Sequence, residues 1–292
     1  MGRFDRLAEF CLDTYGRQSF QAGRSILVNG RCQDVVRSIS TEFGQVANCW
    51  INDPPYGTTL NEWDEVIPEA EYWGMANCIT KAEAPLIVFG SQPFTSAMVM
   101  SADLWHRYCL VWDKNKCGSP GLAKHRPMKT HEDVMVFSRK VHRYYPQMEK
   151  GDPYSRAPAS RKGPNNHKYG FDGHSGIVNT GTRYPKSILH FPRNFSAQQQ
   201  VHPTQKPVPL LEWLLKSYTS PRDLTIDITA GSFSLAAAAF SLNRWCLCIE
   251  QERRYFNLGK AWLTALLRGR VWDPAAYRRQ HLEPTSALSS LL

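Results

Sequence analysis

The sequence predicts an α/β fold with a mostly parallel sheet of seven strands. The first observation is a set of short apolar runs of strand length, at residues 25–28, 46–51, 85–89, 107–112, 133–138, 224–227 and 245–249. The second is that stretches with helical spacing separate most of these runs, which is the alternation expected of a parallel sheet. The third is a polar turn after each of the runs 46–51 and 224–227. Ligands bind beyond the carboxyl ends of strands in such folds, so these turns are candidate sites.

Length and composition indicate a globular protein. The chain has 292 residues, 42% apolar and 21% charged, which suits one large domain or a domain with an insertion. No apolar run approaches the roughly 20 residues that span a bilayer, and the N-terminus lacks the apolar core of a signal peptide. Eight cysteines are scattered without a C-x-x-C pair, which favours a reducing cytoplasm. The net charge of +9 suggests a polyanionic partner.

Helical spacing of apolar side chains precedes and follows the runs. From Phe4 to Tyr15 they recur every three or four residues, so we expect an amphipathic helix there. The same pattern predicts helices at residues 34–39, in the stretch ending near 82, and at 94–100, 207–218, 235–242 and 251–267. Pro207 at the start of one of them suits the first turn of a helix. Beyond Asp273 the tail carries little pattern, and no regular element is expected.

The run 46–51 ends abruptly at Asn52-Asp53-Pro54-Pro55-Tyr56. Two prolines cannot continue a sheet ladder, so the chain leaves the strand here. This places a carboxylate, a rigid backbone and an aromatic ring at the carboxyl end of a strand. The tetrad D-P-P-Y resembles the catalytic motif of the amino-group DNA methyltransferases, which move a methyl group from S-adenosylmethionine to the exocyclic nitrogen of adenine or cytosine.

The chemistry of that reaction accounts for these residue types. The exocyclic amine is a poor nucleophile because its lone pair is delocalised into the ring. The Asp53 carboxylate and the Pro54 carbonyl, held rigid by Pro55, would accept its two hydrogens and free the lone pair. Tyr56 would stack on the extruded base. The resemblance therefore implies catalysis by positioning and by electrostatic stabilisation of the charge that develops on nitrogen.

Further phrases carry the same resemblance over roughly residues 24–267. They are G-S-Q-P-F-T at 90–95, L-V-W-D-K at 110–114, H-E-D-V-M-V-F-S at 131–138 and H-P-T-Q-K-P at 202–207. The catalytic half precedes the cofactor half, which is similar to the β-group of the family. The resemblance implies a Rossmann-like sheet of the S-adenosylmethionine-dependent methyltransferase type, with permuted motif order and an inserted DNA-recognition region.

S-adenosylmethionine is the cofactor that the resemblance implies. Glu250, at the end of the run 245–249, would accept hydrogen bonds from its ribose hydroxyls. A glycine turn between a strand and a helix lets backbone approach a nucleotide-like ligand. The full set of expected cofactor-binding residues is Asp53, His202, Thr204, Lys206, Asp227, Thr229, Gly231, Ser232 and Glu250.

Two residues depart from the family pattern. Arg31 stands where an acid is usual, which argues against an adenosine contact at that position. Phe233 replaces the second glycine of the cofactor loop, and a bulky side chain there should leave no room for a positive φ or for close approach. Its ring would either turn into the adjoining helices or fill the pocket. The first outcome is favoured, because Asp227 and Glu250 would have little reason to persist around a blocked site.

Residues 139–200 differ in amino-acid composition from the rest of the chain. They hold eleven Lys and Arg residues against three acids, a net +8 of the chain's +9, interleaved with aromatics. Cations and aromatic rings suit phosphate contact and base stacking, whereas a solvated loop is the alternative. In the family this segment is the target-recognition region. The DNA-binding residues that we expect in it are Arg139, Lys140, Arg143, Arg156, Arg161, Lys162, Lys168, Arg183 and Lys186.

The organisation that follows has four parts. Residues 1–138 form the catalytic half of the methyltransferase domain, 139–200 the target-recognition insertion, 201–270 the cofactor-binding half and 271–292 a C-terminal tail. His125 and His131 lie in no cluster with zinc spacing, so we expect no metal. The prediction is a DNA methyltransferase acting on adenine N6, with strict or relaxed specificity, in a prokaryotic or phage setting. The alternatives are a cytosine-N4 methyltransferase and an inactive DNA-binding homologue. A homodimer is left open.

Overall fold

All seven apolar runs form strands of one sheet, and two further strands extend it at its edges. The computed structural model describes residues 2–57, 65–118, 120–158, 176–193, 196 and 199–282. Within them the sheet has nine strands, in the order β1-β2-β13-β12-β3-β4-β6-β5-β11. Their bounds are β1 Ser19–Ala22, β2 Ser25–Asn29, β3 Cys49–Asn52, β4 Leu86–Gly90, β5 His106–Gly118, β6 Lys129–Phe137, β11 Ile188–His190, β12 Leu224–Asp227 and β13 Trp245–Glu250.

The expected count of seven strands omits both edges. β1 forms an antiparallel hairpin with β2, and β11 runs parallel to β5. The pairs from β2 through β13, β12 and β3 to β4 are all parallel, whereas β6 is antiparallel to both β4 and β5. The sheet is therefore mostly parallel, and its parallel centre is where several carboxyl ends meet.

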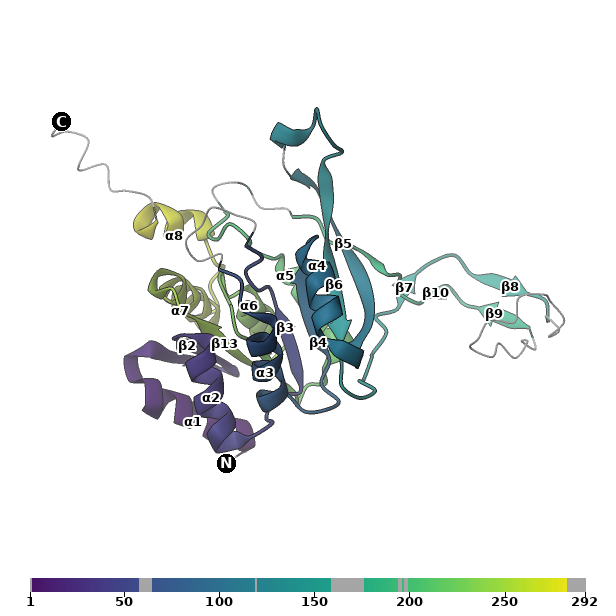
Figure 1. Ribbon diagram of the computed structural model, residues 1–292. Coiled ribbons are helices and arrows are strands. Elements are labelled where there is room, and N and C mark those ends of the chain that lie inside the picture. Colours follow the sequence, from purple (N-terminus) through teal and green to yellow (C-terminus); the bar gives the residue numbers. More distant parts are fainter. Residues whose placement is uncertain are drawn as a thin grey trace. The chain divides into compact units, whose positions relative to one another are not determined.

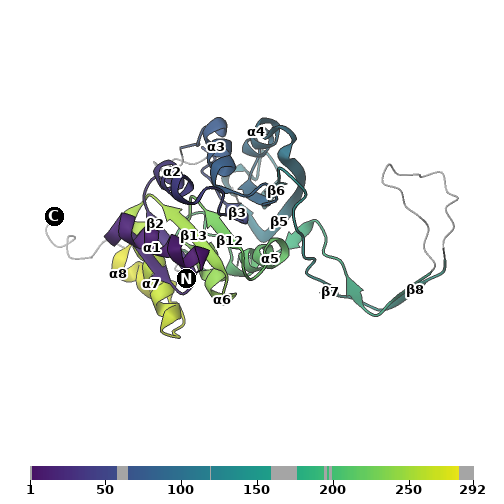
Figure 2. The same cartoon turned by 90° about the horizontal axis from the view of Figure 1, so that it is seen from below.

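Helices cover both faces of the sheet, as Figures 1 and 2 show. Alternate strand residues face opposite cores: Ile26 and Val28 lie in one cluster and Leu27 in the other. The first cluster joins the sheet to α1 Arg3–Tyr15, α2 Cys32–Phe43, α3 Glu69–Ile79 and α4 Phe94–Ser101. The second joins it to α5 Val208–Tyr218, α6 Ser234–Ser241 and α7 Arg253–Leu267. Both faces are buried, so the central strands read as continuous apolar runs.

A further helix, α8 Pro274–His281, lies in the tail where no element was expected. The Asp273 carboxylate accepts a hydrogen bond of 2.9 Å from the Ala276 amide, and Pro274 occupies the first turn. Both are helix-start signals. The helix carries one buried apolar side chain, Tyr277, which explains why no periodic pattern reveals it. None of the described helices is both long and apolar enough to cross a membrane.

Residues 146–186 form a compact unit of their own, separate from the unit made by the flanking chain. It lies inside the interval 139–200. Its described strands pair as two short antiparallel ladders, β7 Glu149–Lys150 with β10 Thr182–Arg183 and β8 Tyr154–Arg156 with β9 Ile177–Asn179. The guanidinium groups of Arg156 and Arg183 lie 5.2 and 4.6 Å from the centroid of the Tyr154 ring.

Candidate active site

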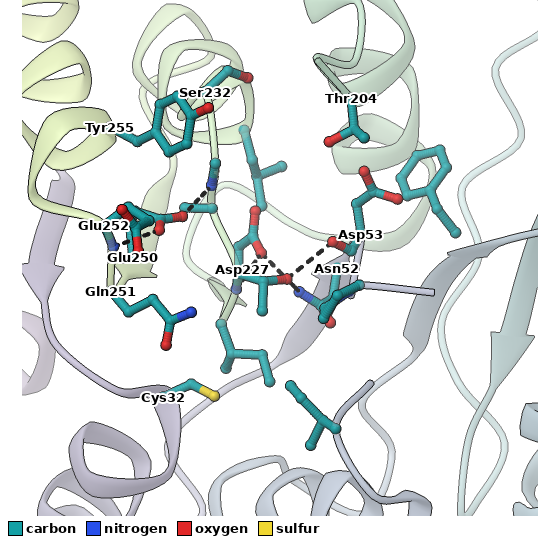
Figure 3. Close-up of a pocket in the computed structure, with 18 of the residues that line it drawn as sticks. Cys32, Asn52, Asp53, Thr204, Asp227, Ser232, Glu250, Gln251, Glu252 and Tyr255 are labelled. Carbon is teal, nitrogen blue, oxygen red and sulfur yellow. Dashed lines mark hydrogen bonds between the residues drawn. The ribbon is translucent and has the colours of Figure 1, made fainter. Parts of the chain in front are cut away.

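A cavity of about 460 Å³ opens at the carboxyl ends of β2, β13, β12 and β3. It lies where strand order places β3 beside β12, which is the kind of position where open α/β sheets bind ligands. Figure 3 shows Asp227 between Asp53 and Thr204 on one side and Glu250, Gln251, Glu252 and Tyr255 on the other. All nine expected cofactor-binding residues line it: Asp53, His202, Thr204, Lys206, Asp227, Thr229, Gly231, Ser232 and Glu250.

Asn52, the last residue of β3, ties the two central strands together. Its amide nitrogen donates to Asp227 Oδ1 at 2.9 Å and to the Thr229 hydroxyl at 2.6 Å. The Tyr72 hydroxyl donates to Asn52 Oδ1 at 3.0 Å, and the Trp50 ring nitrogen donates to Tyr72 at 2.8 Å. This buried chain fixes where the strand ends. The sequence analysis missed Asn52, although its place directly before the tetrad was a usable signal.

Both carboxylate oxygens of Asp53 accept hydrogen bonds. The Tyr56 hydroxyl donates to Oδ1 and the Lys206 ammonium donates to Oδ2. The Thr229 hydroxyl donates to the Asp53 backbone carbonyl at 3.0 Å, so the turn after β3 is also held by the turn after β12. Within the tetrad Pro54 is buried, Pro55 lines the cavity, and the Tyr56 ring lies 4.9 Å from that of Phe94.

Lys206 lies between two carboxylates. Besides Asp53 it contacts Glu132 of β6, with 3.3 Å between Nζ and Oε2, and Glu132 Oε1 accepts a hydrogen bond of 3.1 Å from Lys114 of β5. Burial would lower the pKa of Lys206, but Asp53 and Glu132 raise it above its ordinary value. Burial would likewise raise the pKa of Glu132, but Lys206 and Lys114 bring it below its ordinary value. Lys206 is therefore a protonated cation. The sequence analysis did not select Glu132 or Lys114.

Asp227 and Glu250 are held by amides instead. Asp227 Oδ1 also accepts from the Thr229 amide at 3.1 Å, and Glu250 accepts from the amides of Gly231 at 2.7 Å and Glu252 at 2.8 Å. Burial raises the pKa of each carboxyl group to about 7. Within the described residues no salt bridge reaches either group.

His202 closes the cavity beside the glycine turn. Its ring lies 4.3 Å from that of Tyr255, and the Thr204 amide donates to its Nδ1 at 3.3 Å. Burial lowers the pKa of His202 to about 3, so the ring is neutral. Gly231 has φ +50°, and a Cβ there would lie 3.1 Å from the His202 ring. Both the backbone conformation and the neighbouring ring favour glycine at this position.

Phe233 contradicts the expectation that a bulky residue in this loop cannot take a positive φ. It has φ 60° and ψ 25°, in the left-handed region, directly before α6. Its ring is buried in the core and is not part of the cavity wall. A Cβ on Gly259 of α7 would lie 2.5 Å from that ring, so the absence of a side chain at Gly259 makes the space. The favoured outcome, a ring turned into the helices, is confirmed.

Arg31 directly precedes α2 and lines the cavity together with Gly30, Cys32 and Gln33. The expectation that this position makes no contact with adenosine remains a prediction. Glu252 and Tyr255 complete the same side of the wall. These residues follow β2 and β13, and sequence reasoning selected only Glu250 from that group.

The expected DNA-binding residues divide into two groups. Lys140, Arg143, Arg156 and Lys186 are exposed. Arg139 and Arg183 are half-buried, and their guanidinium groups donate to groups of the fold. Arg139 donates to Asn77 and Thr80, and Arg183 to the Asn179 side chain at 2.5 Å and the Thr182 carbonyl at 2.9 Å. Arg161, Lys162 and Lys168 lie outside the described residues. Where the chain is described, no three His, Cys, Asp or Glu side chains form a group suited to a metal.

Comparison with known proteins matches residues 47–261 to the model of a DNA methylase family of the N6 and N4 type. The type II methyltransferase M1.MboII of Moraxella bovis is 25% identical over 244 residues, 77% of this chain and 91% of that protein. The DNA adenine methyltransferase YhdJ of Escherichia coli is 33% identical over 79 residues, 26% of this chain and 27% of that protein.

Solved structures share the fold. The PvuII cytosine-N4-specific DNA methyltransferase has a TM-score of 0.58 at 14% identity, covering 89% of this chain and 99% of that chain. M1.HpyAVI in complex with SAM has a TM-score of 0.55 at 19% identity, covering 81% and 98%. These likenesses show an α/β fold with a large, mostly parallel sheet.

Proposed function

Because the chain belongs to the DNA methylase family of the N6 and N4 type, we propose that it methylates adenine N6 in DNA with S-adenosylmethionine as cofactor. The observation that carries the proposal is Asp53, at the head of D-P-P-Y and on the wall of the cavity. The adenine enzymes carry Asp at this position more often, whereas the cytosine-N4 enzymes more often carry Ser. The M1.HpyAVI structure is a complex with SAM, which supports the choice of cofactor.

The residues of the cavity fit this cofactor. Asp227 and Glu250 are buried carboxyl groups, and within the described part of the chain their hydrogen-bond donors are amides, so each suits a ligand that brings hydroxyl or ammonium donors. Gly231 leaves the backbone open to close approach beside His202 and Ser232. Glu250 would hold the ribose hydroxyls. When bound, the cofactor supplies an electrophilic methyl group on a sulfonium.

The chain's own residues prepare the nucleophile. The target base leaves the duplex, at a cost of about a few kcal/mol. Asp53 and the Pro54 carbonyl accept the two hydrogens of its amine, which frees the nitrogen lone pair. The Tyr56 ring packs against Phe94, and the base stacks on the Tyr56 ring. Positive charge develops on the nitrogen during methyl transfer. The nearby Asp53 carboxylate stabilises this charge and so lowers the barrier.

Residues 139–200 supply the DNA-binding surface in this proposal. Lys140, Arg143, Arg156 and Lys186 are exposed cations that suit phosphate contacts. The bacterial relatives support a bacterial or phage setting and a cytoplasmic location.

The test is methyl transfer from tritiated S-adenosylmethionine to unmethylated genomic DNA. Digestion to nucleosides identifies the product, and sequencing of the modified positions gives the recognised site. The expected product is N6-methyldeoxyadenosine, formed by the wild type and not by Asp53→Ala. N4-methyldeoxycytidine would establish the cytosine alternative. DNA binding without any transfer would identify the protein as an inactive homologue.

A further inference from the structure

The ammonium group of Lys206 lies on the carboxylate that has to receive the target amine. Lys206 donates to Asp53 Oδ2 while Tyr56 donates to Oδ1, so both oxygens are engaged before any substrate arrives. Methyl transfer builds positive charge on the amine nitrogen. A cation on the same carboxylate repels that charge, and the repulsion is strong in a buried site. The arrangement seen here is therefore unfavourable for the reaction unless Lys206 withdraws.

A second carboxylate lies on the other side of the ammonium group. Glu132 Oε2 is 3.3 Å from Lys206 Nζ. This oxygen is buried, and among the described residues none donates a hydrogen bond to it. Lys114 holds the other oxygen at 3.1 Å, and the two lysines keep the group ionised by lowering its pKa. Glu132 is thus a charged acceptor with one oxygen available to Lys206.

Aromatic rings surround the space between the two carboxylates. Lys206 Nζ lies 5.0 Å from the centroid of Phe89 and 5.9 Å from that of Trp112. The faces of aromatic rings attract cations. The two rings therefore stabilise the ammonium when it lies between the carboxylates, too far from either for a short hydrogen bond. The Lys206 side chain is buried and its ammonium already contacts both acids, so a change of partner needs only a short movement.

We propose that Glu132 is a positioning residue that draws Lys206 away from Asp53 when the target amine arrives, leaving Asp53 Oδ2 to the amine. The proposal rests on the proposed function and deepens it. Glu132 is not among the residues that line the cavity, so it acts through Lys206. Lys206 guards Asp53 while no base is present, and the exchange of its partner accompanies entry of the base.

The test is the single-turnover rate of methyl transfer at saturating cofactor, on a duplex that contains the mapped site. In Glu132→Gln the neutral amide competes poorly for Lys206, so we expect the rate to fall at least tenfold, with cofactor and DNA affinities within threefold of wild type. Lys114→Met combined with Glu132→Gln removes one charge of each sign and should show the same loss if the single variant folds poorly. Asp113→Asn is the matched control, because Asp113 pairs with His190 at 3.0 Å and does not contact Lys206. It should retain the wild-type rate.

A double-mutant cycle separates this role from a structural one. In a Lys206→Met background, Glu132→Gln should change the rate less than twofold, because Glu132 has no cation left to move. An equal loss in both backgrounds would overturn the proposal, as would a Glu132→Gln rate equal to wild type. A readout without catalysis is the NMR signal of the Lys206 ammonium when the duplex and S-adenosylhomocysteine are added. It should move in the wild type and stay in Glu132→Gln. Absence of any transfer by the wild type would instead refute the proposed function together with this inference.

Discussion

The two ends of the cavity treat their buried carboxyl groups differently. At the catalytic end Asp53 accepts from the Lys206 ammonium, which is shared with Glu132. At the other end Asp227 and Glu250 accept from amides, and burial raises the pKa of both to about 7. The difference teaches that burial alone does not set the charge of an acid. Lys206 opposes the burial that raises the pKa of Asp53, and together with Lys114 it holds the pKa of Glu132 below its ordinary value, whereas amide donors leave Asp227 and Glu250 half-protonated near pH 7.

The largest effect is expected from removing the acid at the catalytic end. Asp53→Ala should lower the single-turnover rate at least about a thousandfold, roughly 4 kcal/mol, because the amine loses its charged acceptor. Cofactor affinity, measured by calorimetric titration, should change only a few-fold, since Asp227 and Glu250 remain. A rate near that of the wild type would remove Asp53 from the mechanism.

For the stability of the glycine turn before α6, the packing of the Phe233 ring matters more than the positive φ of Phe233. Phe233→Gly should lower the free energy of unfolding by about 2–4 kcal/mol, because the cavity left by the ring outweighs the relief of a positive φ. Asn243→Gly is a matched control, since Asn243 has φ 52° but an exposed side chain. It should change stability by less than about 0.5 kcal/mol. Urea unfolding measures both, and a stabilised Phe233→Gly would contradict the packing argument.

The pH dependence of stability should have opposite signs for Glu250 and for Glu132, the carboxylate that shares Lys206 with Asp53. The pKa of Glu250 rises from 4.5 to about 7 on folding, so its contribution is full below pH 4.5 and is lost as pH rises to about 7. The free energy of unfolding of Glu250→Gln, relative to wild type, should therefore increase by about 2–3 kcal/mol over that window.

Glu132 provides the contrast for this measurement. Its pKa is lowered on folding, so its contribution is present above its unfolded value of 4.5 and is lost as pH falls through the lower folded value. Relative to wild type, Glu132→Gln should lose stability as pH rises through this acidic range. Urea unfolding between pH 3.5 and 8 gives both curves, and equal signs would erase the distinction between the two ends.

The smallest effect is expected from the exposed cations of residues 139–200. Replacing Lys140, Arg143 and Lys186 with Ala should weaken DNA binding and reduce the dependence of log affinity on log salt by about 1 per lost phosphate contact. Arg279→Ala, an exposed cation on α8, is the control. Fluorescence anisotropy at several salt concentrations decides. An unchanged slope would mean that these residues do not touch the backbone of DNA.

The strands that could be predicted from the sequence are those with a continuous run of apolar residues. Each central strand is buried on both faces, so its run is unbroken and easy to find. The edge strands Ser19–Ala22 and Ile188–His190 are short and partly exposed, and they lack such a run. The helix α8 is set by a polar start signal at Asp273 and Pro274, while its apolar surface is small. Elements stabilised mainly by neighbours leave little trace in the sequence.

The site divides in the same way. All nine expected residues lie on one cavity. Asp53, Asp227, Thr229 and Glu250 meet there because the parallel sheet brings strand ends together, and the phrase before α5 adds His202, Thr204 and Lys206. Glu132 lies within a strand phrase, and its link to Lys114 and Lys206 exists only across space. Charge alone does not separate Arg139 and Arg183 from their neighbours, since only the fold shows that their guanidinium groups donate to Asn77 and Asn179. Their selection as DNA-binding residues stays a prediction.

Residues 146–186 leave and rejoin the chain at two points that are both held by backbone hydrogen bonds. On one side the Tyr145 amide donates to the Ser217 carbonyl at 2.7 Å, and on the other the Val111 amide donates to the Ser187 carbonyl at 2.8 Å. Each junction is thus fastened to the methyltransferase unit just outside the segment. Recombination at these two points would replace the whole segment without cutting a strand pair of the nine-stranded sheet or removing a residue of the cavity wall. In the proposed function this segment belongs to the DNA-binding surface, so its replacement would give a new target and leave the residues of the cavity unchanged.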